Sequence, residues 1–191
     1  MVSQIKVNEI IKQSGSSITI GESGDAITLT GSTVTMPSGA TLTNFPDNTP
    51  AFEAKTGSDV DVTSGAVTKV QFDTELFDTD SCYDTSNYRF TPNVAGKYYI
   101  WSIVGCNSKS NANLETVEVR LYKNGSWENT AHFDFRTNNA RFAAPMVASV
   151  ITFNGSSDYV ESYVNIGDSS GNPNTQANYY SRFGGYKLIG A

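Results

Sequence analysis

Five carboxylates lie within one twelve-residue segment and are the clearest candidates for metal chemistry: Asp73, Glu75, Asp78, Asp80 and Asp84. Calcium takes about six to eight oxygen ligands, many of them from acidic loops, so such a segment could hold calcium. Its spacing lacks the glycine and closing glutamate of an EF-hand. A solvated acidic loop and a carboxylate pair that cleaves glycosidic bonds are the alternatives. The metal candidates are Asp73, Asp78, Asp80 and Asp84, and no cofactor other than this calcium ion is expected.

The single histidine, His132, has a carboxylate two residues away at Asp134. Residues two apart in a strand share a face, so Asp134 could orient the imidazole. No serine or cysteine nucleophile motif accompanies the pair, and one histidine is too few for a histidine-based zinc site. We therefore expect a structural or interface histidine and no enzyme.

Two asparagine-rich stretches, residues 107–113 and 165–178, are candidates for recognition. Long loops on a rigid scaffold usually carry binding residues. Asn, Ser, Gly and Tyr together offer adaptable hydrogen bonds and flat aromatic surface, which suits sugars or protein surfaces. The alternative is a loop tip that only keeps the protein soluble. The binding-loop candidates are Asn107, Asn111, Asn113, Asn172, Asn174, Asn178 and Tyr179.

The elements that must position these residues are strands, and the clearest covers residues 96–106. Aromatic and β-branched residues alternate there with a period of two, which is typical of a strand. Apolar residues fall on both faces, which predicts a central strand with material packed on either side. We expect five residues here to be mostly buried: Phe90, Tyr98, Ile100, Trp101 and Val104.

About ten short strands separated by turn residues predict an all-β antiparallel sandwich or jelly roll, with no helix longer than a turn. Asn124-Gly125 and Asn154-Gly155 are the dipeptides that hairpin turns prefer. The expected strands are residues 50–55, 59–63, 66–73, 87–91, 96–106, 114–123, 127–135, 145–153, 158–166 and 178–189.

Residues 1–44 contain no aromatic residue, whereas all 22 aromatic residues follow from Phe45 onward. Apolar residues in this region sit two apart between turn signals, which predicts short strands. Each repeat offers too few inward residues to fold alone, so we expect several chains to share one stem core. A flexible linker is the alternative. The trimer-stem residues are Ile18, Ile20, Ile27, Leu29, Val34 and Met36.

The domain boundaries follow from this change in composition. Residues 1–44 form the stem and attachment segment, residues 45–50 a proline-marked neck, and residues 51–191 the head. Near the N-terminus, residues 3–13 fit either a strand or a short helix, and the dominance of Ile and Val favours the strand. By position, this segment is expected to attach or register the trimer.

Composition excludes several classes of function. The net charge is −6 and the 13 basic residues are scattered, so nucleic-acid binding is not expected. The N-terminus lacks the apolar core and cleavage site of a signal peptide. No segment reaches the roughly 20 apolar residues of a membrane helix, and no membrane insertion is expected. Whether Cys82 and Cys106 pair is left open by the sequence.

Several short motifs, in order, resemble those of C1q/TNF-like jelly-roll domains over roughly residues 50–191. The motifs are Pro50-Ala51-Phe52, Val70-Gln71-Phe72-Asp73, Tyr83-Asp84, Tyr88-Arg89-Phe90-Thr91-Pro92, Ala95-Gly96, Tyr98-Tyr99-Ile100, and the closing stretch from Ser181 to Ile189. The resemblance implies a jelly-roll head that assembles as a homotrimer. Some members of the family bind calcium in their loops.

A Ser/Thr/Gly-rich stem, a proline-marked neck and such a head together resemble a bacteriophage fibre or virion structural protein of the marine or cyanophage type. The resemblance implies a homotrimer that is assembled in the host cytoplasm and displayed on the particle surface. Its N-terminal segment would bind other virion proteins, and its head would bind a host-surface glycan or protein or neighbouring virion proteins. A secreted C1q-like or lectin-like binding module and a glycan-cleaving tailspike are the alternatives.

Overall fold

The computed structural model describes residue 38 and residues 47–189. The chain divides into two units, Met1–Thr43 and Asn44–Ala191, and the described fold is that of the second unit. The predicted stem residues, from Ile18 to Met36, and the first two residues of the predicted neck lie outside the described residues.

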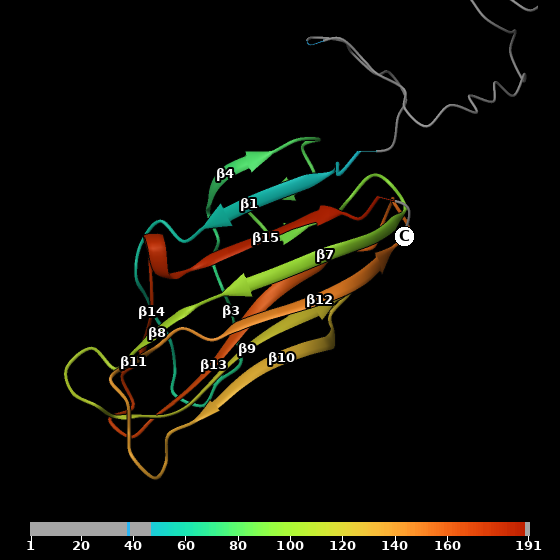
Figure 1. Ribbon diagram of the computed structural model, residues 1–191. Helices are drawn as coiled ribbons and strands as arrows, with labels where there is room; N and C mark the ends of the chain where they lie inside the picture. Colours follow the sequence, from blue (N-terminus) through green and yellow to red (C-terminus); the bar gives the residue numbers. More distant parts are fainter. Residues whose placement is uncertain (1–37, 39–46, 190–191) are drawn as a thin grey trace, which may run out of the picture. The chain divides into compact units, whose positions relative to one another are not determined.

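Three antiparallel sheets make up the head (Figure 1). Sheet I has the order β12 (Met146–Phe153), β7 (Gly96–Ile103), β15 (Arg182–Lys187), β1 (Ala51–Lys55) and β4 (Thr74–Asp78). Sheet II has the order β10 (Ser126–Asp134), β9 (Leu114–Lys123), β13 (Val160–Asp168), β6 (Arg89–Phe90) and β5 (Tyr83–Asp84), with β3 (Thr68–Lys69) also paired to β13. The small sheet III has the order β11 (Phe142–Ala143), β8 (Gly105–Asn107), β14 (Asn174–Gln176) and β2 (Val60–Asp61).

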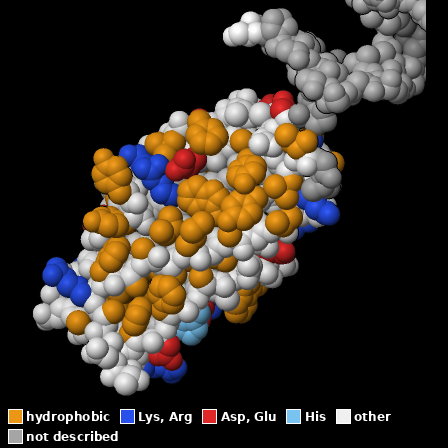
Figure 2. All heavy atoms as spheres, in the orientation of Figure 1, with side chains coloured by type: hydrophobic (Ala, Val, Ile, Leu, Met, Phe, Trp, Pro, Cys, Tyr) orange, Lys and Arg blue, Asp and Glu red, His pale blue; other side chains and the backbone are white. Residues whose placement is uncertain are grey.

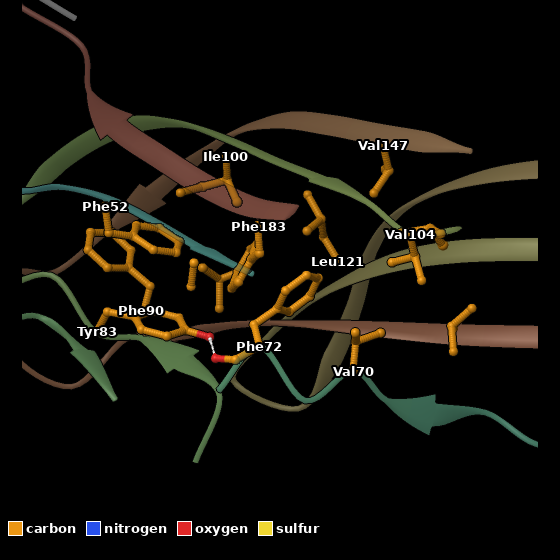
Figure 3. Close-up of a cluster of buried hydrophobic side chains, with 14 of the residues drawn as sticks. Phe52, Val70, Phe72, Tyr83, Phe90, Ile100, Val104, Leu121, Val147 and Phe183 are labelled. Atoms are coloured by element: carbon orange, nitrogen blue, oxygen red, sulfur yellow. Dashed lines mark hydrogen bonds between the residues drawn. The ribbon is translucent and has the colours of Figure 1, made fainter. Parts of the chain in front are cut away.

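Aromatic side chains from both large sheets fill the core between them (Figure 3). The Phe52 ring stacks on Phe90 and Tyr83, with centroids 4.2 Å and 4.9 Å away, and meets Phe183 edge-on at 5.0 Å. The buried Tyr83 hydroxyl donates to the Phe72 carbonyl at 2.9 Å, so the phenol is satisfied inside the core. Sheets I and II therefore form an all-β antiparallel sandwich, as predicted.

The predicted central strand is correct on one face and wrong on the other. Phe90, Tyr98, Ile100 and Val104 are buried, as expected. Trp101, however, is only half-buried. It points away from sheet II, and within the described residues no second layer covers that face of sheet I. Alternation identified the strand, but it could not show that only one of its two apolar faces packs inside the chain.

Several predicted boundaries also need correction. The expected strand 96–106 breaks into β7 and β8, and the expected strand 178–189 starts with the 3-10 helix η1 (Asn178–Tyr180). The expected acidic loop contains β4 and β5, and the expected loop 165–178 begins inside β13 and contains β14. Strand β9 matches the predicted residues 114–123. Among the described residues η1 is the only helical element, in line with the absence of long helices in the prediction.

The two Asn-Gly turns differ in what they connect. Asn124 and Gly125 have φ values of 51° and 77° and join β9 to its antiparallel partner β10, so the predicted hairpin is confirmed. Asn154-Gly155 instead links β12 of sheet I to β13 of sheet II, and the hairpin prediction is wrong there. The Asn154 Oδ1 accepts the N–H groups of the next residues, 156–158, and this wider loop carries the chain across the sandwich.

Candidate functional site

The acidic segment does not converge on one point. The Gly57 N–H donates to Asp73 Oδ1 at 2.7 Å, and the Tyr83 N–H donates to Asp78 Oδ2 at 2.7 Å. Asp80 accepts a hydrogen bond from the Thr79 hydroxyl, and Asp84 accepts hydrogen bonds from the backbone N–H groups of residues 86 and 87 in its own turn. Hydrogen bonds, chiefly from the Asn87 side chain, lower the pKa of Asp84. In residues 38 and 47–189, no three His, Cys, Asp or Glu side chains lie close enough together to hold a metal ion.

Calcium binding by this segment therefore stays a prediction, with its own test. If Asp78 and Asp80 bind calcium, chelation should lower the melting temperature of the parent, and the double variant Asp78→Asn with Asp80→Asn should no longer respond. Identical melts of the parent with calcium and with chelator would show that the carboxylates only close local turns.

The side chain of the single histidine, His132, lies near the carboxylate of Glu118. His132 Nδ1 is 3.8 Å from Glu118 Oε1 on the neighbouring strand. Asp134 pairs instead with Arg136, and this hydrogen bond lowers the pKa of Asp134. His132 and Asp134 are thus not joined as an orienting pair.

The two asparagine-rich stretches meet at one end of the sandwich. Asn107 of β8 lies opposite Asn174 of β14, and both side chains are buried. The Lys109 ammonium bridges the stretches, since it donates to Asn172 Oδ1 at 3.2 Å and pairs with Asp61 at 2.6 Å. The remaining candidates of the two tips are more accessible: Asn111 and Asn172 are exposed and Asn113 is half-buried.

Asn178 and Tyr179 lie in η1 and face solvent. Asn178 has a φ of 60°, and its Oδ1 accepts a hydrogen bond from the Lys55 ammonium at 3.4 Å. Tyr179 is 86% exposed. The next residue, Tyr180, packs edge-on against Phe142, with ring centroids 5.1 Å apart. Tyr179 is the one aromatic residue among the predicted binding residues, and its ring is open to solvent.

The outer face of sheet I carries an exposed apolar patch that the sequence motifs do not single out as a site. Figure 2 shows hydrophobic side chains gathered over β15, β7 and β12. Val150 is 54% exposed and Met146 is 51% exposed. Trp101 lies close over Gly184, where a Cβ atom would come within 2.8 Å of the indole ring. The apolar members of this face are Phe77, Tyr99, Trp101, Ile103, Met146, Ala148, Val150 and Tyr186.

Charged residues lie beside the apolar side chains of this face. Arg182 donates to Glu53 at 2.9 Å, and the strand pairing puts Lys55 and Lys97 on the same side of sheet I. A contiguous exposed apolar patch of this kind marks an interaction surface. The second set of alternating residues on β7 was the sequence signal for it, although we assigned that set to burial within the chain.

Cys82 and Cys106 are buried and form no disulfide. Burial raises the pKa of the Cys106 thiol far above its usual range. Residues 38 and 47–189 form no pocket, and no helix among them is long and apolar enough to cross a membrane.

No protein-family model matches the sequence, and no curated protein sequence matches it. Solved structures are similar in fold. The globular domain of zebrafish complement 1qA protein matches with a TM-score of 0.51 and 14% identity, over 73% of this chain and 98% of that one. Eiger TNF from S. frugiperda matches with a TM-score of 0.54 and 11% identity, over 76% of this chain and 96% of that one.

Murine APRIL, crystallised at pH 5.0, matches with a TM-score of 0.53 and 10% identity, over 72% of this chain and 98% of that one. At these identities the similarity shows the fold alone. The head described here is an antiparallel jelly roll of the C1q/TNF-like fold.

Proposed function

We propose that this chain is a non-enzymatic virion structural protein of a bacteriophage, a homotrimeric fibre or decoration protein. Its head would mediate adhesion to the host surface or to neighbouring virion proteins. The observation that carries the proposal is the exposed apolar face of sheet I, which needs a partner.

A second copy of the chain is the partner that this face fits best. The face combines flat aromatic rings with aliphatic side chains on β12, β7 and β15, and Glu53, Lys55, Lys97 and Arg182 lie beside them. An apolar centre with charged residues around it resembles the composition of an interface between subunits. Closed rotational symmetry would let each copy bury the same residues. The thin apolar stripe of the predicted stem and the family resemblance both favour three copies.

The direction of the chain through the head supports a display role. The described chain enters β1 at one end of the sandwich, whereas the loops around residues 108–113 and 136–141 lie at the opposite end (Figure 1). The exposed residues of that end are candidates for contact with a host glycan or protein.

Light scattering coupled to size exclusion tests the trimer on the full chain. The expected mass is three times the 20.6 kDa of one chain. Val150→Glu, on the edge strand β12 of the apolar face, should lower the mass toward that of one chain. Val67→Glu is the matched control, because Val67 is 44% exposed and lies outside this face. A parent that remains monomeric at micromolar concentration would contradict the proposal.

The fold similarity also favours a second candidate, a C1q-like or lectin-like binding module that acts outside a virion. Immunoelectron microscopy of the source particles with an antibody against the head separates the two functions, because only the virion protein would label them. A tailspike would instead depolymerise host polysaccharide, and an assay of reducing ends would detect it.

A further inference from the structure

The outer face of sheet II presents two cross-strand rows of aromatic and charged residues. One row runs Trp127, Tyr122, Glu161, Arg89 across β10, β9, β13 and β6. The second row runs Thr130, Arg120, Tyr163, Lys69 across β10, β9, β13 and β3. Adjacent strands lie about 4.8 Å apart, so each row spans about 14 Å of nearly flat surface.

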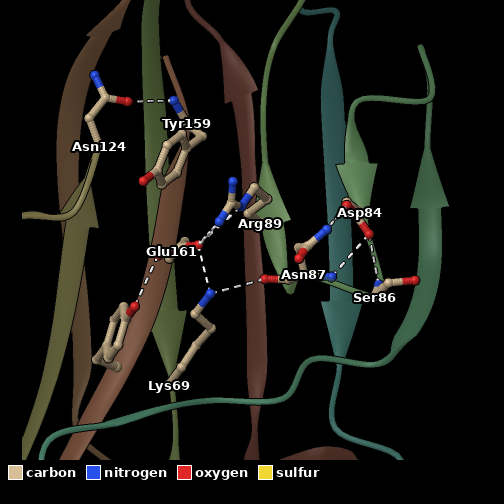
Figure 4. A network of polar contacts seen from close by, with 9 residues as sticks. Lys69, Asp84, Ser86, Asn87, Arg89, Asn124, Tyr159 and Glu161 are labelled. Carbon is tan, nitrogen blue, oxygen red and sulfur yellow. Dashed lines mark hydrogen bonds and ion pairs between the residues drawn. The ribbon is translucent and has the colours of Figure 1, made fainter. Parts of the chain in front are cut away.

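A buried carboxylate holds the centre of this face in place (Figure 4). Glu161 is 2% exposed, and its Oε1 lies 2.8 Å from both the Lys69 ammonium and the Arg89 guanidinium. Its Oε2 accepts the Tyr163 hydroxyl at 3.1 Å. Both cations keep about a third of their side chains accessible and have N–H groups left over, so they stand as fixed donors at the surface.

The rings are held by the same network. Arg89 lies over the Tyr159 ring at 4.1 Å, and Arg120 lies over the Trp127 ring at 4.4 Å. The Tyr122 and Tyr163 centroids are 4.5 Å apart. Trp127 remains 56% exposed. Aromatic surface is therefore presented in fixed positions between hydrogen-bonding groups, which lowers the entropic cost of binding.

The charges on this face balance locally. Glu161 and the nearby Asp84 offset Lys69 and Arg89, and Glu118 accepts a hydrogen bond from Arg120. Asp84 is turned into its own loop, where it accepts N–H groups from residues 86 and 87. A locally neutral face on a chain of net charge −6 does not attract a polyanion. A neutral ligand therefore suits this face better than a charged one.

Two further features separate this face from the apolar face of sheet I. It carries charged pairs at its centre, where protein interfaces are depleted of charge. It also exposes aromatic rings, above all that of Trp127. A ligand that fits this face needs apolar C–H surface that packs on the aromatic rings. It also needs hydroxyl groups, which can accept hydrogen bonds from the guanidinium and ammonium groups and donate to the carboxylates.

We propose that the outer face of sheet II binds a neutral glycan built of pyranose rings. Sugar rings pack on Trp127, Tyr122 and Tyr163, and sugar hydroxyls bond to the free donors of Lys69 and Arg89. This inference rests on the binding role proposed above, and it needs neither the trimer nor the asparagine-rich loops.

Calorimetry on the full chain tests the site with three neutral probes: maltohexaose, cellohexaose and mannohexaose. At least one should bind, and Trp127→Ala should weaken that binding about two- to tenfold, as expected for one aromatic contact. Lys69→Gln should also weaken it. Lys69→Gln removes one partner of the buried Glu161 carboxylate, so the thermal melt of this variant is measured as well. If Lys69→Gln unfolds, the binding of Trp127→Ala decides the test.

Tyr179→Ala is the matched control, because it removes an exposed aromatic ring at the loop end, and it should leave binding unchanged. If Tyr179→Ala weakens binding and Trp127→Ala does not, the glycan site lies at the loops, and only the proposed binding role survives. Failure of all three neutral probes would overturn the inference. So would equal or tighter binding of hexagalacturonate or poly-glutamate, because charge rather than sugar rings would then be recognised.

Discussion

At the scale of single residues, Glu161 shows how a charge is kept inside this fold. Its carboxylate is almost fully buried, yet it accepts hydrogen bonds from Lys69, Arg89 and Tyr163. Burial, together with the neighbouring Glu161 charge, raises the pKa of Tyr163 to about 12, so the phenol stays protonated and donates near neutral pH. The carboxylate would be costly to bury without these partners.

Glu161→Gln should therefore destabilise the head by about 1–3 kcal/mol, because a charged acceptor shared by two cations is lost. Urea unfolding followed by fluorescence measures the change. Glu53→Gln is the control, because Glu53 is half-buried on sheet I and, among the described residues, pairs only with Arg182. It should cost less than about 1 kcal/mol. An equal cost for both variants would show that the burial of Glu161 has no energetic consequence.

Asp158 gives the stability of the head a dependence on acid pH. The Asn124 amide donates to its Oδ1 at 2.8 Å, and the Asn154 N–H donates to its Oδ2 at 3.0 Å. The hydrogen bond from Asn124, with help from Lys123, lowers the pKa of Asp158 below 3.8 in the folded state. The stability that this carboxylate contributes is thus present above about pH 4 and is lost as the pH falls through the folded-state pKa.

Asp158→Asn should lower the melting temperature at pH 7, and the difference from the parent should shrink as the pH falls toward about 2. Melting curves across this range provide the measurement. Glu75→Gln serves as control, since no hydrogen bond of the Glu75 side chain is found among the described residues. A difference between parent and Asp158→Asn that stays constant with pH would contradict the assignment.

At the scale of elements, the two Asn-Gly turns are matched in backbone but not in surroundings. Gly125 and Gly155 have φ values of 77° and 74°. A Cβ atom on Gly125 would meet only the Tyr159 hydroxyl, 3.9 Å away. On Gly155 it would lie 2.3 Å from the Ala95 nitrogen, since the β12–β13 crossover packs on the turn before β7. Of these two turns, only the second would bring an added Cβ atom against the backbone of another segment.

Gly125→Ala should cost about 1–2 kcal/mol, the strain of a left-handed backbone alone. Gly155→Ala carries the same strain and must also displace the backbone near Ala95, which adds about 1–3 kcal/mol. Chemical denaturation of the two variants gives the comparison directly. Equal costs would mean that the crossover moves freely away from Ala95.

At the scale of the whole molecule, the head has its own aromatic core, whereas the predicted stem has only thin apolar stripes. Phe52, Phe90 and Phe183 pack within one chain, so the head does not need partners to build its core. The six stem residues from Ile18 to Met36 must instead be buried by other chains if they form strands. The proposed trimer thus depends on two separate surfaces, the stem and the outer face of sheet I.

Ile27→Asp with Leu29→Asp should expose residues 1–44 to protease and leave the head folded, because the head core is independent of the stem. Limited proteolysis with mass spectrometry identifies the cut sites, and the near-ultraviolet spectrum reports on the head. Val67→Glu, which changes charge on the head alone, is the control. A stem that resists protease in a monomeric parent would contradict shared burial.

What the sequence determined by itself is local. Strand β9 and the buried face of β7 are encoded by alternation over eight to ten consecutive residues, and the Asn124-Gly125 hairpin is encoded by a dipeptide. Such patterns need no knowledge of the partner strand, because each strand presents its own apolar side to whatever covers it. The all-β antiparallel class and most of the core could be predicted for this reason.

Only the tertiary structure decided which surfaces meet. Strand β14 has three residues and strand β5 has two, which is too few for any periodicity. They form because other strands supply their backbone hydrogen bonds: β14 pairs with β8, where Asn174 lies opposite Asn107, and β5 pairs with β6, where Tyr83 lies opposite Phe90. The Glu161 centre joins positions 69, 89 and 161, whose proximity no local pattern encodes. Likewise Trp101 has the sequence context of a core residue, but its exposure depends on whether a second layer covers sheet I. Contacts between distant segments are set by packing of the whole chain, and a local pattern carries no information about them.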